Sequence, residues 1–148
     1  MNSLTTEILN ALIPILICIE SNGNPSAIGD NGKAIGILQI HCRTVEDINR
    51  IIGENRFTYD DRYDWDKSIE MCVIYLQYYY ASFVRWYNKP NTYTPSVNAD
   101  NPYEICARLW NGGYYGTKYN PRATDSYWDK VEDRLEEHFT DVSSEVFY

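Results

Sequence analysis

The sequence lacks the features that would place the chain in a membrane or on a polyanion. Its longest apolar segment, Ala11 to Ile19, contains Pro14, whereas a bilayer-spanning helix needs about 20 apolar residues. No Lys or Arg precedes Lys33, so the basic leading region of a typical export signal is absent and we expect synthesis in the cytoplasm without an export signal. The net charge of -8 would repel nucleic acid and anionic lipid. We therefore predict no nucleic-acid partner and no membrane insertion.

Cysteine and histidine are also scarce. The four cysteines, Cys18, Cys42, Cys72 and Cys106, are widely separated and match no zinc-binding spacing. His41 is one of only 2 histidines, so a closed metal site is not expected. Nor does the chain contain a nucleotide or flavin motif. We predict reduced thiols, no metal and no cofactor.

What is present predicts one mainly α-helical domain over residues 1–148, with residues 140–148 as a loosely held tail. Apolar residues recur at helical spacing in five segments, separated by proline, glycine and asparagine. The glycine pair Gly112 and Gly113 should end the fourth helix, which leaves residues 114–122 as a loop. The expected helices cover residues 5–20, 44–52, 64–88, 101–111 and 124–139.

One short stretch is typical of strands. The residues Asp30-Asn31-Gly32-Lys33 form a tight-turn sequence between two small apolar pairs, residues 27–28 and 34–35. We therefore expect a two-stranded hairpin directly after the first helix. It would place the carboxylate of Asp30 near the tip of the hairpin.

Glu20 stands at the end of the first helix, after an apolar run. Apolar neighbours that withdraw a carboxyl group from water favour its neutral form and raise its pKa. A glutamic acid that is still protonated near neutral pH can donate a proton to a leaving oxygen, as glycosidic bond cleavage requires. The residues that follow, Ser21-Asn22-Gly23-Asn24-Pro25, leave the helix at once and would expose the acid at a cleft wall.

The order of these residues resembles the signature of the soluble lytic transglycosylase family of lysozyme-like enzymes. That signature comprises Glu-Ser, Asn-Pro-x-Ala and Gly-Leu-Met-Gln, followed by Tyr-Asn-x-Gly and Thr-x-x-Tyr-x-x-Lys-Val. The corresponding residues here are Glu20-Ser21, Asn24-Pro25-x-Ala27, Gly36-Ile37-Leu38-Gln39, Trp110-Asn111-Gly112-Gly113 and Thr124-x-x-Tyr127-x-x-Lys130-Val131. This chain departs from the pattern at Leu38 and Trp110, and in a hairpin turn that is about one residue longer.

The resemblance implies a lysozyme-like domain that cleaves the β-1,4 bond between N-acetylmuramic acid and N-acetylglucosamine in peptidoglycan glycan strands. Glu20 would be the catalytic acid, and Ser21 and Gln39 would brace the cleft beside it. Asn111 would line the opposite wall, and Tyr127 would approach Glu20 or the sugar. Each of the last four residues also has a purely structural interpretation: Ser21 and Asn111 as helix ends, Gln39 as a strand hydrogen-bonding group and Tyr127 as a core residue.

Trp110 stands where the family has tyrosine, and it would either stack on a sugar ring or pack inside the domain. Aromatic side chains suit both purposes, because they combine a flat apolar body with a polar tip.

The reaction outcome stays open at this point. A lytic transglycosylase needs a single acid and gives a 1,6-anhydro product, and we favour this outcome. A hydrolase needs a second carboxylate about 5–9.5 Å from the first, for which Asp30 is the leading candidate and Asp64 or Asp66 are weaker ones. A non-catalytic peptidoglycan-binding or structural module with the same fold is the alternative from a different class. Chitin oligomers are a further possible substrate.

The acidic charge would steer the chain away from an acidic cell-wall polymer. We therefore expect another component to bring it there. A phage-type setting fits, with the protein carried in a virion or released through a membrane lesion, and so does a bacterial enzyme injected or exported by another system.

Overall fold

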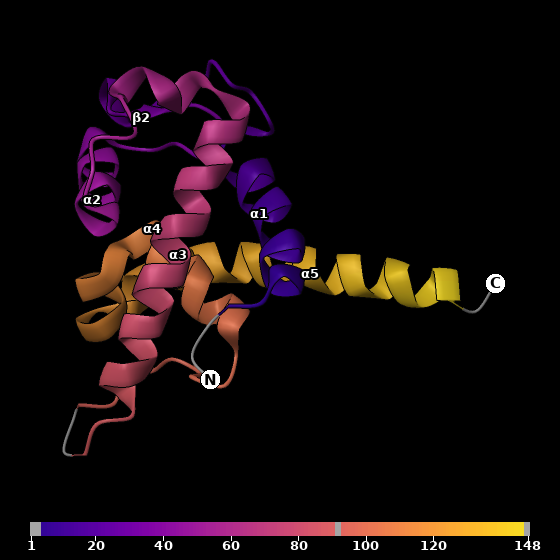
Figure 1. The fold of residues 1–148 in the computed structure, drawn as a ribbon. Coiled ribbons are helices and arrows are strands. Elements are labelled where there is room, and N and C mark those ends of the chain that lie inside the picture. Colours follow the sequence, from indigo (N-terminus) through magenta and orange to yellow (C-terminus); the bar gives the residue numbers. More distant parts are fainter. Residues whose placement is uncertain (1–3, 91–92, 147–148) are drawn as a thin grey trace. The chain divides into compact units, whose positions relative to one another are not determined.

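The computed structural model describes residues 4–90 and 93–146, with side chains described up to residue 141. In chain order the elements are α1 (Thr6–Ser21), β1 (Ile28–Gly29), the 3-10 helix η1 (Asp30–Gly32), β2 (Ala34–Ile35), α2 (Cys42–Ile52), the 3-10 helix η2 (Tyr59–Tyr63), α3 (Trp65–Tyr87), α4 (Pro102–Tyr119), the 3-10 helix η3 (Pro121–Thr124) and α5 (Asp125–Val146). Figure 1 shows them coloured along the chain. The fold is mainly helical with one small hairpin, as predicted.

The chain divides into two compact units, residues 16–78 and residues 1–15 with 79–148. The first contains the hairpin, in which β1 and β2 pair antiparallel with Ile28 opposite Ile35 and Gly29 opposite Ala34. Its buried apolar residues come from the end of α1, the hairpin return, α2 and the start of α3. They include Leu16, Ile37, Leu38, Ile48, Met71 and Leu76.

Two predicted boundaries in this unit are corrected in detail. The second helix begins at Cys42, because His41 already has the extended backbone of an N-cap and its carbonyl accepts from the amides of Thr44 and Val45. It ends at Gly53 as predicted, in a left-handed conformation. The third helix begins at Trp65, with the Asp64 side chain accepting a hydrogen bond from the amide of Lys67 at 2.9 Å.

The second unit contains α4, η3 and α5, which pack on one another. Asn101 caps α4 as predicted, accepting from the amides of Tyr103 and Glu104. The predicted loop over residues 114–122 is wrong. Gly113 breaks the helix, with φ 77° and ψ 176°, but helical structure resumes and continues to Tyr119. The hydroxyl of Thr117 donates to the carbonyl of Gly113 at 2.8 Å, which secures the restart.

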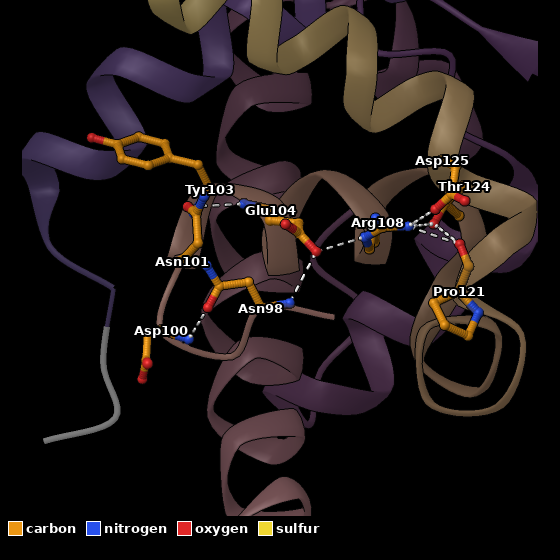
Figure 2. A network of polar contacts seen from close by, with 9 residues as sticks. All are labelled: Asn98, Asp100, Asn101, Tyr103, Glu104, Arg108, Pro121, Thr124 and Asp125. Atoms are coloured by element: carbon orange, nitrogen blue, oxygen red, sulfur yellow. Dashed lines mark hydrogen bonds and ion pairs between the residues drawn. The ribbon is translucent and has the colours of Figure 1, made fainter. Parts of the chain in front are cut away.

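A buried polar network joins α4 to the start of α5 (Figure 2). Glu104 accepts a hydrogen bond from Arg108 Nε at 3.1 Å. The Arg108 Nη1 group donates to three oxygens, those of Pro121, Thr124 and Asp125, at 2.8, 3.0 and 2.7 Å. Burial of an arginine is tolerated when its donors are satisfied in this way. The network fixes the turn that carries Thr124.

The last helix extends further than the predicted end near residue 139, because its backbone stays helical to Val146. Val131 and Leu135 are buried as predicted, and Trp128 is buried as well, whereas Tyr127 is half-buried. No helix in the described ranges 4–90 and 93–146 is long and apolar enough to cross a membrane.

Candidate active site around Glu20

Glu20 is the penultimate residue of α1, in the unit formed by residues 16–78. Leu16 and Ile17 before it are buried, and Glu20 itself is half-buried. The helix ends directly after it because Asn22 and Gly23 both adopt positive φ, 54° and 78°, a conformation that glycine and asparagine tolerate best. Glu20 therefore lies where a helix ends at a turn, as expected. The raised pKa of its carboxyl group stays a prediction.

Ser21 fastens this helix end to the segment that follows the hairpin. Its hydroxyl lies 2.8 Å from the carbonyl oxygen of Ile37, to which it donates, and it accepts a hydrogen bond from the amide of Gly23 at 3.1 Å. The first bond joins segments that are 16 positions apart in the sequence. Ser21 thus sets the position of the neighbouring Glu20 backbone relative to the hairpin return.

Gln39 braces the base of the hairpin from the other side. Its backbone has φ 52°, and its amide Nε2 donates to the carbonyls of Ala27 at 3.2 Å and Gly36 at 3.0 Å. The Oε1 atom lies so close to Gly29 that a Cβ at that position would collide with it. The side chain is therefore held between β1 and the turn that follows β2. Contact between Gln39 and substrate stays a prediction.

Arg62 was not singled out from the sequence, yet it ties η2 to the hairpin. This buried side chain donates to three backbone carbonyls, those of Tyr59, Lys33 and Ile40, at 2.7, 3.3 and 3.1 Å. Its own carbonyl oxygen lies against Gly36, where a Cβ would overlap it. An arginine in a polar, charged stretch resembles a surface residue, so the sequence gives no signal for this role.

Asp30 lies at the hairpin tip, as predicted. Its side chain is 60% exposed, and its Oδ2 atom lies 3.1 Å from Nε2 of His41, the N-cap residue of α2. Asp30 and Asn31 both have positive φ, 50° and 55°. The structure therefore gives this carboxylate a defined partner, the imidazole. Asp64, one of the weaker candidates for a second carboxylate, is a helix cap.

Trp65 was also missed, and it lies beside the turn that follows Glu20. Its indole is 45% exposed, and its benzo ring would contact a Cβ at Gly23 at 3.8 Å. An exposed indole next to the proposed acid is suited to stacking on a sugar ring. The sequence did show an aromatic residue, Trp65, directly after the Asp64 cap. Helical periodicity, however, indicated only that Trp65 begins a helix.

The other three predicted residues belong to the second unit. Trp110 is half-buried and Asn111 is exposed, just before the break at Gly113 in α4. Tyr127 is half-buried in the first turn of α5. Four of the predicted site residues, Glu20, Ser21, Asp30 and Gln39, therefore belong to the same unit, residues 16–78. The substrate-binding roles of the remaining three stay predictions.

None of the four cysteines forms a disulfide. Burial raises the pKa of the Cys106 thiol strongly, which keeps it protonated and unreactive. No group of three or more His, Cys, Asp or Glu side chains that could hold a metal occurs among the residues that the structure describes.

These features define a mainly α-helical chain whose first helix carries a glutamate in its last turn and is followed by a braced hairpin. A family model, Transglycosylase SLT domain, matches residues 1–98, about two thirds of the chain. The chain belongs to this family, and its fold is lysozyme-like. Membership implies peptidoglycan transglycosylase activity in general, with glycan strands as the polymer acted upon.

The matched range includes Glu20, Ser21, Asp30 and Gln39, while Trp110, Asn111 and Tyr127 lie beyond it. A search of curated proteins found no match. A search of solved structures found none either.

Proposed function

We propose that the chain is a lytic transglycosylase that cleaves the β-1,4 bond between N-acetylmuramic acid and N-acetylglucosamine, with Glu20 as the sole catalytic acid and base. In the first step the Glu20 carboxyl group donates its proton to the glycosidic oxygen, and the bond from that oxygen to C1 of the muramic acid breaks. In the second step the Glu20 carboxylate accepts the proton of the muramic 6-hydroxyl as its oxygen bonds to C1. The product is a 1,6-anhydro ring, and no water is consumed.

The placement of Asp30 is the observation that carries this proposal. A retaining or inverting hydrolase needs its second carboxylate to face the sugar or a water beside it. Asp30 lies on an exposed tip and is engaged by His41 at 3.1 Å, an arrangement that suits a turn-stabilising role. The single-acid route requires no second carboxylate, so it is the simpler fit to this site.

The hydrogen bonds around Glu20 also support the proposal. Ser21 and Gln39 each hydrogen-bond to the hairpin segment that follows Glu20 in the chain, Ser21 to the carbonyl of Ile37 and Gln39 to those of Ala27 and Gly36. A catalytic acid must be held close to one position for proton transfer to be efficient. The bonds of Ser21, the residue next to Glu20, support such positioning.

The decisive experiment is digestion of purified peptidoglycan in ¹⁸O-labelled water, with mass spectrometry of the products. We expect anhydro-muropeptides without label. Reducing-end products that incorporate ¹⁸O would refute the anhydro route and favour hydrolysis. Cell-wall gel zymography should show clearing by the parent protein and loss of clearing by Glu20→Gln.

Asp30→Asn separates the two mechanisms further. This variant should retain clearing within about threefold if Asp30 serves only the turn, whereas removal of a catalytic carboxylate would cost several orders of magnitude. Equal clearing by the parent and Glu20→Gln would remove Glu20 from the mechanism. Wall binding without clearing by any version of the chain would indicate the non-catalytic module.

We further propose that the protein acts on the wall after release, injection or delivery by a particle. The support is its net charge of -8, which opposes free adsorption to an acidic polymer. Raising the salt from low to physiological strength should therefore not reduce its activity, because screening weakens repulsion. A steep loss of activity with salt would contradict this view.

A further inference from the structure

Four aromatic rings surround one lysine in the second unit. The ammonium group of Lys118 lies 4.6 Å from the ring centroid of Trp86, 4.7 Å from that of Tyr114, 5.5 Å from that of Tyr115 and 5.1 Å from that of Tyr119. Trp86 belongs to α3, and the tyrosines follow the break in α4. We call these five residues the aromatic cluster.

Contacts of the buried Lys118 and of neighbouring rings hold the aromatic cluster in place. Lys118 is only 7% exposed, and each cation–π contact of this kind stabilises by a fraction of a kcal/mol or more. Trp86 meets Tyr119 edge to face with centroids 6.0 Å apart, and the hydroxyl of Tyr114 donates to the Ser82 carbonyl at 3.4 Å. The rings are therefore fixed before any ligand arrives, which reduces the entropy cost of binding.

Two members of the cluster are freely accessible. Tyr115 is 71% exposed and Tyr119 is 59% exposed, although both are large aromatic residues. They stand four positions apart on one helix, so their side chains share a face with about 5–6 Å between their Cβ atoms. Tyrosines that are not needed for the core and lie side by side on the surface form a platform for flat ligands.

The charges in the surrounding sequence indicate which class of ligand this surface would bind. The chain carries 21 acidic residues, but none occurs between Glu70 and Asp100 or between Glu104 and Asp125. The cluster belongs to these two segments, whose charged residues are all basic. They are Arg85, Lys89, Arg108, Lys118 and Arg122. Of these, Arg85, Lys89 and Arg122 are exposed, whereas Lys118 is buried and Arg108 is buried in ion pairs with Glu104 and Asp125. In a protein of net charge -8, a locally basic aromatic surface is complementary to an anionic polymer.

We propose that the exposed face of the aromatic cluster, built on Tyr115 and Tyr119, is an accessory binding surface for peptidoglycan glycan strands, distinct from the residues around Glu20. The axial C–H groups of a sugar ring carry partial positive charge and pack on the electron-rich face of a tyrosine. The exposed residues Arg85, Lys89 and Arg122, each within three positions of a cluster residue in the sequence, would attract the carboxylates of the wall polymer. The choice of polymer rests on the proposed function, whereas the existence of the surface does not.

The test measures binding in a background without turnover. In Glu20→Gln, the double variant Tyr115→Ala with Tyr119→Ala should bind purified sacculi about tenfold more weakly in co-sedimentation, a loss of two stacking contacts. The matched control is Tyr59→Ala with Tyr93→Ala, because these tyrosines are also exposed, at 47% and 62%. The control should bind within twofold of the parent. Equal binding by both double variants would overturn the proposal.

A second measurement separates this surface from the reaction site. In the otherwise unchanged protein, the Tyr115 and Tyr119 double variant should keep its turnover of short soluble muropeptide chains while it clears intact sacculi more slowly. Equal loss on both substrates would assign these tyrosines to the reaction site and overturn the accessory role. Failure of the proposed function would be visible separately, as clearing by Glu20→Gln or as ¹⁸O incorporation.

Two further outcomes bear on the ligand and on the lysine. Binding of a single-stranded oligonucleotide at the same site, tighter than binding of sacculi, would overturn the glycan assignment, since aromatic and basic surfaces can also stack bases. Lys118→Met keeps most of the side-chain volume but removes the cation, so it should weaken sacculus binding by severalfold. Unchanged binding by Lys118→Met would refute its positioning role.

Discussion

Substitution of Gly36 by alanine tests the packing of the hairpin return against η2. Gly36 has φ +83°, and an added Cβ would overlap the carbonyl oxygen of Arg62 and lie 3.0 Å from its carbonyl carbon. That carbonyl is not free to retreat, because it accepts a hydrogen bond from the buried hydroxyl of Ser68 at 3.0 Å. The Arg62 side chain is also fixed, since it donates to the carbonyls of Lys33 and Ile40.

Two effects add in Gly36→Ala. A non-glycine residue in the left-handed region costs about 1–2 kcal/mol, and overpacking of a close contact costs about 1–3 kcal/mol more. The expected loss is therefore about 2–5 kcal/mol of unfolding free energy. For a chain of this size, each kcal/mol corresponds to about 2–4 °C in the melting temperature.

Gly32→Ala is the matched control, because Gly32 has a similar φ of +88° but no atom within 4 Å of an added Cβ. It should lose only the backbone contribution, about 1–2 kcal/mol. Urea unfolding followed by tryptophan fluorescence measures both, with comparison of midpoints at constant slope. Equal destabilisation of the two variants would refute the close approach of Gly36 to Arg62.

Three further predictions concern the site and the core. Ser21→Ala removes the bond to Ile37 and the acceptor for the amide of Gly23, so it should cost about 1–3 kcal/mol of stability and lower kcat in a muropeptide release assay. Trp65→Ala should raise KM for glycan chains about tenfold with a smaller change in kcat, measured by steady-state kinetics, because it removes an exposed stacking surface. Burial raises the pKa of the Cys106 thiol in the folded protein, whereas a thiol in the unfolded chain ionises at about pH 8.5. Above that pH only the unfolded state loses this proton, so stability should fall by about 1.4 kcal/mol per pH unit, which urea midpoints at pH 8 and pH 10 would detect.

Each of these has its own control. Ser26→Ala alters an exposed serine of the same loop and should leave stability within about 0.5 kcal/mol; an equal effect on both serines would contradict the role of Ser21. Trp65→Phe should restore most of the substrate affinity, and failure to do so would argue against stacking. Cys106→Ala should flatten the alkaline loss of stability, and an unchanged slope would assign that loss to other groups.

Local sequence signals predicted much of the fold. The hairpin followed from Asp30-Asn31-Gly32-Lys33, since this turn chemistry acts within four residues. The cap at Asn101 and the stop at Gly53 were confirmed for the same reason. Such features depend on neighbours in the chain, so they are visible before the chain folds.

The parts that were missed depend on partners distant in sequence. Helix after Gly113 was not expected, because two adjacent glycines favour a break. The bond of Thr117 to the Gly113 carbonyl and the contacts of Lys118 with Trp86 support the restarted helix, and the second of these depends on a distant partner. Arg62 was overlooked because two of its three acceptors, the carbonyls of Lys33 and Ile40, lie more than 20 positions away. In the candidate site, Trp65 was assigned to a helix start, and its position beside Gly23 is visible only in three dimensions.

The three bonds of Arg62 have a consequence for the order of folding. Two of its carbonyl acceptors belong to the hairpin and its return, so that segment cannot reach its final arrangement until Arg62 is available. During synthesis the turn after Glu20 would leave the ribosome before Arg62 does. The hairpin would therefore lack the hydrogen bonds of Arg62 until that residue has been added and has emerged. Closing such a loop carries an entropy cost before any contact compensates it. A nascent chain that stops short of Arg62 should therefore present Glu20 beside a hairpin that still lacks two of its hydrogen bonds.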